Sequence, residues 1–345
     1  MHNLSTVNTP RHAPRARPAL RERLGLCQWF HFEDFKMIER TIALMSELDV
    51  KHLRTGVSWA DYVRPGGKAF YDWQMRELRN AGIEVLLSVW HVPPSISEAS
   101  ACNAPPRRVQ DYADFIDRLI TDYGDGFADL ELWNEPNNRY KWNFPEHDPW
   151  WRKFGEMIGA AAYWAKRRGR RTVLGGMMPV DHHWLNLMQY YGVTRYIDVV
   201  AIHAFPGMWF PEHPNWDWHE HWAGWADKID YVAPHAQGKP IWCTETGLAT
   251  WDLATNRVAK YELQVEKLDD VAAAPCERLY WYSLIDLDPA REAIEGFHVD
   301  ENEYHMGLVA FDGHRKDGFF RLKELMRADA TARRATKQRT GAVTS

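Results

Sequence analysis

The chain has 345 residues, of which 45% are hydrophobic and 26% are charged, and its formal net charge is −5. This composition is typical of a folded globular protein, and the net negative charge gives no indication of a nucleic-acid partner. The four cysteines contain no Cys-x-x-Cys pair, which argues against a zinc or redox motif. No run of about 18 apolar residues occurs, so no membrane span is predicted.

The two ends of the chain differ in composition from the rest. Residues 1–21 are basic and rich in proline, and they lack the apolar stretch of a secretory signal. We therefore predict a disordered basic N-terminal tail and a cytoplasmic location. Residues 329–345 are predicted to form a disordered C-terminal tail, and residues 22–328 to form one folded domain.

Within residues 22–328, short apolar runs alternate with longer helical patterns. The predicted strands are residues 24–32, 51–59, 83–90, 128–134, 172–178, 197–205, 240–246 and 278–287. The predicted helices follow them at residues 35–49, 71–82, 107–124, 149–169, 183–191, 222–232, 257–274 and 318–328. Continuously apolar strands indicate burial on both faces. Eight strand–helix units therefore predict a single (β/α)8 barrel, and no change of composition marks an accessory β-sandwich.

The functional residues of such a barrel are expected where its strands end, at the C-terminal mouth. Glu135 follows the apolar run LELWN, and Glu245 lies at the end of IWCTET. The fourth and seventh strands bring these two carboxylates to one mouth although 110 residues separate them (245 − 135). Two carboxylates at one mouth are the minimum equipment for glycoside hydrolysis. Arg54, on the second strand, is expected to lie beside Glu245.

Other polar and aromatic residues end the remaining strands and are predicted to bind a substrate. These residues are Trp29, His31, Arg54, Trp90, His91, Asn134, His203 and Trp281, and Trp209 follows in the loop after the sixth strand. The chain has 18 tryptophans. The aromatic rings of the long loops after strands four and six either stack on a sugar face or pack these loops onto the barrel. Glu131 is predicted to be a barrel-interior group, and no metal site or cofactor is predicted.

The stretch LELWNEPN resembles the fourth-strand motif of clan A glycoside hydrolases. This resemblance implies that Glu135 is the catalytic acid/base and that Asn134 binds the sugar 2-hydroxyl. Glu245, in CTETG, is similar to the nucleophile of the clan's seventh strand, and Arg54 to the arginine that holds it. The resemblance spans about residues 22–328.

Two further positions fit this resemblance, and one departs from it. His91 is similar to a third-strand histidine at the first sugar subsite, and Trp281 to the aromatic residue beneath that sugar. Family 39, a β-xylosidase-like group, is the nearest resemblance and family 5 the second. The chain departs from family 5 at His203-Ala204-Phe205, where that family often has His-x-Tyr, so no phenol from this strand can contact the nucleophile.

The resemblance implies a retaining glycoside hydrolase that cleaves β-linked or α-L-arabino-type glycosides by double displacement. Exo action on oligosaccharides is expected, with an oligosaccharide or glycoside as the substrate and without nucleic acid, membrane or cofactor. Two alternatives stay open, namely a transglycosidase that uses the same residues and a non-catalytic carbohydrate-binding barrel. The sequence gives no prediction of the oligomeric state.

Overall fold

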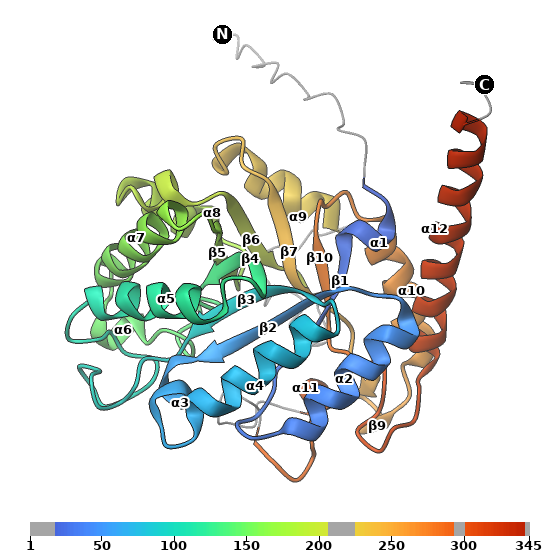
Figure 1. Ribbon diagram of the computed structural model, residues 1–345, viewed down its shortest axis with the longest axis horizontal. Coiled ribbons are helices and arrows are strands. Elements are labelled where there is room, and N and C mark those ends of the chain that lie inside the picture. The colour runs from blue at the N-terminus through green and yellow to red at the C-terminus, as the bar shows by residue number, and fades with distance from the viewer. Residues whose placement is uncertain (1–17, 206–224, 293–300, 342–345) are drawn as a thin grey trace, which may run out of the picture.

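The structure is a computed structural model, and it describes residues 18–205, 225–292 and 301–341. Eight parallel strands form a closed barrel in the order β1-β10-β7-β6-β5-β4-β3-β2 (Figure 1). The barrel strands are β1 (Leu24–Cys27), β2 (His52–Ser58), β3 (Glu84–Trp90), β4 (Phe127–Leu132), β5 (Arg171–Met177), β6 (Val199–His203), β7 (Ile241–Thr246) and β10 (Leu279–Tyr282). The predicted (β/α)8 barrel is confirmed.

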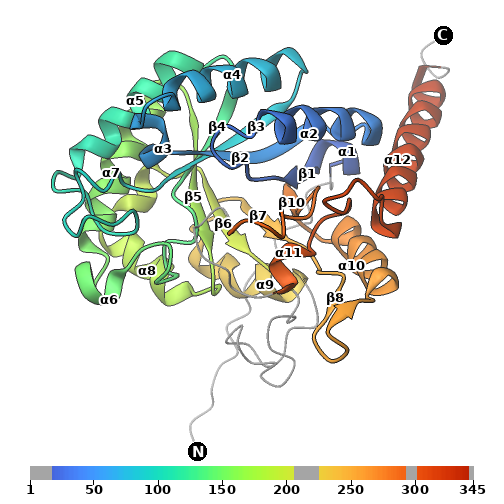
Figure 2. The same cartoon turned by 90° about the horizontal axis from the view of Figure 1, so that it is seen from below.

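Helices surround this barrel on its outside, as both views show (Figures 1 and 2). They are α1 (Leu20–Arg23), α2 (Phe35–Leu48), α3 (Trp59–Val63), α4 (Gly67–Asn80), α5 (Gln110–Tyr123), α6 (Phe144–His147), α7 (Arg152–Arg167), α8 (His182–Tyr190), α9 (Trp225–Val232), α10 (Tyr261–Ala273), α11 (Glu301–Tyr304) and α12 (Asp317–Gly341). Two 3-10 turns, η1 (Val193–Tyr196) and η3 (Ala233–His235), and a small antiparallel hairpin of β8 (Trp251–Asp252) and β9 (Arg257–Val258) complete the described elements.

Local sequence explains where individual helices begin and end. The side chain of Asp34 caps α2 by accepting a hydrogen bond from the backbone N–H of Met37 at 3.2 Å. Asp49 ends the same helix in the left-handed conformation. The barrel strands are buried along nearly their whole length, which is the reason for their continuously apolar sequence.

Several predicted boundaries are wrong. The first strand ends at Cys27 rather than at residue 32. The side chain of the next residue, Gln28, accepts a hydrogen bond at 2.8 Å from the backbone N–H of Ile285. The predicted helix 257–274 is divided between β9 and α10. Both discrepancies lie next to the mouth of the barrel, where the chain turns to present side chains instead of continuing a regular element.

The predicted C-terminal tail needs correction, whereas residues 1–17 of the predicted N-terminal tail lie outside the described residues. Helix α12 continues to Gly341, so residues 329–341 are helical rather than disordered. Asp329 accepts a hydrogen bond at 2.9 Å from the backbone N–H of Leu20, which joins the short helix α1 to α12. The stretch after residue 328 lacks the apolar periodicity of a packed helix, but it is rich in alanine, arginine, lysine and glutamine, which favour helix intrinsically.

Two other predictions concern what the fold does not contain. The described residues form no separate β-sandwich beside the barrel. None of the helices within them is long and apolar enough to cross a membrane.

Candidate active site

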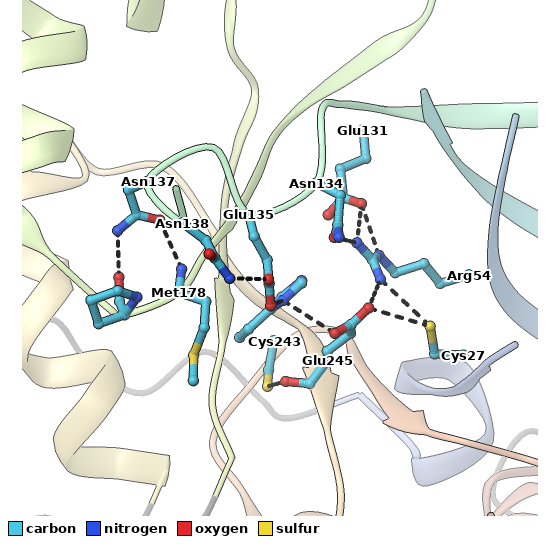
Figure 3. Close-up of polar contacts among 12 residues, drawn as sticks. Cys27, Arg54, Glu131, Asn134, Glu135, Asn137, Asn138, Met178, Cys243 and Glu245 are labelled. Atoms are coloured by element: carbon cyan, nitrogen blue, oxygen red, sulfur yellow. Dashed lines mark hydrogen bonds and ion pairs between the residues drawn. The ribbon is translucent and has the colours of Figure 1, made fainter. Parts of the chain in front are cut away.

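The two predicted glutamates meet at the C-terminal mouth of the barrel (Figure 3). Glu245 is on β7, and Glu135 follows β4 after a two-residue extension. The backbone near this mouth has unusual conformations, because Trp133, Glu135 and His91 have positive φ angles of 75°, 44° and 62°. Non-glycine residues held in this region cost about 1–3 kcal/mol each and cluster at functional sites.

His203, on β6, lies between the two carboxylates. Its Nδ1 is 2.8 Å from Oε1 of Glu135 and 3.2 Å from Oε2 of Glu245. One atom from each of the three side chains lies within 4.8 Å of the other two. The His203 side chain is fully buried, and its Nδ1 faces both carboxylates.

The protonation state of His203 follows from this burial. Removal from water lowers the pKa of the imidazole to about 4, although the neighbouring carboxylate of Glu245 acts in the opposite direction. The ring is therefore neutral near pH 7. Nδ1, which faces carboxylate oxygens, is assigned as the protonated nitrogen, because a carboxylate accepts hydrogen bonds and an imidazole N–H donates them.

Glu245 is held mainly through its Oε1 atom. Arg54 donates to this oxygen through Nη1, and the indole N–H of Trp29 donates to it at 3.3 Å. The thiol of Cys27 is 3.8 Å from the same atom. Burial raises the pKa of the Cys27 thiol well above its usual value, so it stays protonated and acts as a weak donor.

Arg54 connects Glu245 to the barrel interior. Its guanidinium also donates to Oε2 of Glu131 at 2.8 Å and to Oδ1 of Asn134 at 2.7 Å. Burial alone disfavours the charged guanidinium, but the carboxylates of Glu131 and Glu245 raise its pKa well above the usual value. Glu131 is fully buried, which confirms it as a barrel-interior group.

Glu135 contacts an amide and an imidazole. The amide of Asn138 donates to Oε2 of Glu135 at 3.0 Å, while His203 contacts Oε1. The next residue back, Asn137, anchors the loop to the end of β5 by donating to the carbonyl of Pro179 at 2.6 Å and accepting from the N–H of Met178 at 2.9 Å. Sequence reasoning missed both asparagines, although they directly follow the WNEP motif.

Among the predicted ring residues, Trp29, Trp90 and His91 pack against one another, and Trp29 also contacts Glu245. Trp29 and Trp90 lie 5.3 Å apart between ring centroids, and the ring of His91 is 3.9 Å from that of Trp90. Trp281 is fully buried on β10. His31 is half-buried, and its Nε2 is 2.9 Å from the carbonyl of Glu292.

The aromatic residues of the loop after β4 differ in their exposure to solvent. Tyr140 is 52% exposed and Trp150 is 74% exposed, whereas Trp142 is fully buried and packs against Trp133. The first two are therefore available to a ligand and the third packs the loop. Trp209 and the aromatic residues around it in the loop after β6 lie outside the described residues.

Two further features of the polar residues are a spacing typical of metal ligands and a buried ion pair. Glu135, His203 and Glu245 have a spacing that could hold a metal ion, but the Arg54 guanidinium beside Glu245 places a positive charge where a cation would bind. Asp286, near the end of the eighth predicted strand, forms a buried ion pair with Lys316 at 2.8 Å. Asp286 therefore has a structural contact.

The closed barrel of eight parallel strands defines a class of fold, that of the (β/α)8 barrels. Solved structures of this class superpose on nearly the whole chain. A GH5_18 protein from Streptomyces cattleya in complex with GlcNAc has a TM-score of 0.66 and 17% identity, covering 91% of this chain and 82% of its own. A monomeric β-xylosidase from Caulobacter crescentus CB15 has a TM-score of 0.61 and 16% identity, covering 90% and 69%. A family 39 glycoside hydrolase from Bacteroides cellulosilyticus WH2 has a TM-score of 0.59 and 16% identity, covering 89% and 64%.

Likeness in sequence is much weaker than this likeness in fold. No family model matches the chain. Beta-glucosidase 7 from Arabidopsis thaliana is 24% identical over 114 residues, which are 30% of this chain and 22% of that protein. The matched segment thus spans less than a quarter of that relative.

Proposed function

We propose that this protein is a retaining glycoside hydrolase. The observation that carries the proposal is the close approach of the two glutamates. One carboxylate oxygen of Glu135 lies within 4.8 Å of one carboxylate oxygen of Glu245. Retaining enzymes have carboxyl groups about 5–5.5 Å apart, whereas inverting enzymes need about 6.5–9.5 Å to admit a water molecule. The short distance between the carboxylates of Glu135 and Glu245 favours a retaining mechanism with a covalent intermediate over an inverting mechanism.

The different partners of the two glutamates support different roles. Arg54 and Trp29 both donate to Oε1 of Glu245, which fixes the position of this carboxylate, as a nucleophile requires. Oε2 of Glu245 faces His203 and the side of Glu135, and we assign it as the attacking atom. Glu135, which contacts the amide of Asn138 and the ring of His203, is assigned as the acid/base.

These assignments give a two-step reaction. Glu245 attacks the anomeric carbon while Glu135 donates a proton to the leaving oxygen, so the glycosidic bond breaks and a glycosyl–enzyme ester forms. Glu135, now a carboxylate, removes a proton from water, which attacks the anomeric carbon and releases Glu245. Two inversions at one carbon retain its configuration.

The proposed substrates are β-linked or α-L-arabino-type glycosides, cleaved from the end of an oligosaccharide. A β-xylosidase is among the structures with this fold, which supports the xyloside class as the first to be examined. Exposed Tyr140 and Trp150 in the loop after β4 supply flat apolar surfaces of the kind that stack on sugar rings. This loop, which also carries Asn138, supports action at a chain end rather than along an open cleft.

The test is a panel of nitrophenyl glycosides, with the anomer of the first product followed by NMR. We expect hydrolysis of at least one β-glycoside with retention. Glu245→Ala should abolish turnover, and azide should restore only a glycosyl azide of inverted configuration. Glu135→Ala should be rescued by azide with retention on substrates that have a good leaving group.

The matched control is Glu84→Ala, which removes an exposed carboxylate at the opposite end of the barrel and should leave the rates unchanged. Inverted product from the wild-type protein, or full activity in a folded Glu245→Ala variant, would contradict the proposal.

A further inference from the structure

Behind the carboxylate pair, two buried polar atoms face the same small space. Nε2 of His203 and Oγ1 of Thr244, on β7, have no hydrogen-bond partner among the residues that the structure describes. Both side chains belong to residues with 0% exposure. A buried polar group left unpaired costs about 1–3 kcal/mol, so two such atoms in one place require an explanation.

Gly176, on β5, shows that these two atoms border the same space, no more than 5.0 Å apart (2.2 + 2.8), although they are not hydrogen-bonded to each other in this structure. A Cβ atom added at Gly176 would overlap Nε2 and Cδ2 of His203 and would lie 2.8 Å from Oγ1 of Thr244. The missing side chain of this glycine is therefore what gives the imidazole room, and the threonine hydroxyl borders the same space.

The chemistry of the two atoms is complementary. With the proton of the neutral ring on Nδ1, which faces Glu135 and Glu245, Nε2 is a bare acceptor. A threonine hydroxyl is a donor that rotates about its C–O bond to meet an acceptor. A hydrogen bond between them, formed after a small shift of the side chains or through one bridging water, would satisfy both atoms. It would also disfavour the other tautomer, in which Nε2 carries the proton.

We propose that Thr244 is a positioning residue that donates a hydrogen bond to Nε2 of His203 and thereby keeps the proton of the imidazole on Nδ1, facing the two carboxylates. Thr244 acts through His203 and touches neither carboxylate. The proposal deepens the proposed function, because its consequence for catalysis rests on the roles of Glu135 and Glu245.

Other groups around His203 set the conditions for this role. Glu245 and Glu131 favour the protonated imidazole, whereas Arg54 and Lys141 disfavour it, and Glu135 contacts Nδ1 directly. Oε1 of Glu131 is a further buried oxygen without a hydrogen bond among the described residues. Because a carboxylate is also an acceptor, the experiment has to distinguish this oxygen from Nε2 of His203 as the acceptor of the threonine proton.

A first measurement needs no substrate. Thr244→Val keeps the shape of the side chain but removes the hydroxyl. If the hydroxyl pairs with Nε2, the variant should lose thermal stability by about 2–4 °C, because a buried acceptor is left unpaired. Thr41→Val is the matched control, because Thr41 on α2 is also fully buried and its hydroxyl also lacks a partner within the described ranges. That variant should be neutral or more stable.

The deciding measurement is NMR of the protein labelled with ¹⁵N-histidine, with His203 identified by its loss in His203→Asn. In the wild-type protein we expect the proton on Nδ1 and an Nε2 resonance shifted by an accepted hydrogen bond. Thr244→Val should move the Nε2 resonance of His203 and populate the other tautomer, and Thr244→Ser should restore the wild-type spectrum. An Nε2 resonance that is the same in wild type and Thr244→Val, whether the proton goes to Glu131 or nowhere, would overturn the proposal.

Kinetics then separate this inference from the proposed function. On a substrate that the wild type cleaves, Thr244→Val should lower kcat about fivefold to tenfold with little change in KM, and Thr244→Ser should recover most of it. If no glycoside is cleaved but the NMR result holds, only the proposed function fails. If Thr244→Val changes the tautomer without changing kcat, or leaves the tautomer unchanged, the positioning role is wrong while the function stands.

Discussion

The indole nitrogen of Trp29 donates a hydrogen bond to Oε1 of Glu245 at 3.3 Å. The strand-six residue that could have carried a phenol is Phe205. A ring from the end of the first strand therefore supplies the neutral donor, and the guanidinium of Arg54 lies 4.9 Å from the centre of this ring. Gly56 makes the arrangement possible, because a Cβ there would lie 2.5–2.8 Å from a Trp29 ring atom and the backbone oxygen of Ser88.

Replacing Trp29 by phenylalanine should lower kcat/KM about tenfold or more. The substitution keeps an aromatic ring against Arg54 and Trp90 but removes a hydrogen bond to a charged oxygen, which is worth about 1.5–3 kcal/mol. The rates of both proteins on one aryl glycoside give the comparison. Trp242→Phe is the matched control, because the Trp242 indole N–H is buried and has no acceptor in the described part of the chain. Equal losses in the two variants would mean that ring size, and not the N–H, is what matters.

Replacing Gly176 by alanine should impair both stability and activity. The added methyl group would overlap the His203 ring, which contacts Glu135 and Glu245, so either the ring or the backbone must shift. We expect a loss of about 1–3 kcal/mol in the free energy of unfolding and a severe loss of turnover. Denaturant unfolding and the rate on an aryl glycoside measure these effects.

Gly159 on α7 provides the control for this substitution. A Cβ at this position meets nothing within 4 Å, and the residue lies inside a helix. Gly159→Ala should therefore stabilise the protein by about 0.5–1 kcal/mol and leave activity unchanged. Retained stability and rate in Gly176→Ala would show that the close approach of His203 to β5 is not required.

The stability of the protein should decrease when the pH falls from about 6.5 towards 4. Burial, with Arg278 nearby, lowers the pKa of His52 to about 4 in the folded protein, from 6.5. Between these values the unfolded chain binds a proton that the folded chain does not, so acid favours unfolding. At 1.36 kcal/mol per pKa unit, the contribution of His52 reaches at most about 3 kcal/mol.

His52→Gln isolates this contribution, because His52 lies at the start of β2, at the opposite end of the barrel from the carboxylate pair. Urea unfolding of both proteins at pH 7.5 and pH 5 gives the difference between the two slopes. The wild type should lose more stability than the variant over this interval. Parallel pH dependence in the two proteins would assign the acid sensitivity to other groups, of which His203 is the first candidate.

The sequence alone predicted the barrel and the position of both glutamates at its mouth. Eight apolar strands that alternate with helices leave few other ways to bury both faces of each strand. The context of Glu135 was readable because its neighbours Trp133, Asn134 and Pro136 are contiguous in the chain. The sequence did not predict the extension of α12 beyond residue 328, because a helix without an apolar stripe has no periodic hydrophobic pattern.

Tertiary structure decided the other contacts of the two glutamates. Arg54 was expected beside Glu245, but nothing in the spacing of Trp29, after β1, and His203, on β6, shows that they converge on the same residue. Convergence depends on strand register and on where each strand stops, which small steric features such as Gly56 and Gly176 control. Sequence periodicity therefore selects the fold, whereas close packing at the mouth of the barrel fixes the donors around the two carboxylates.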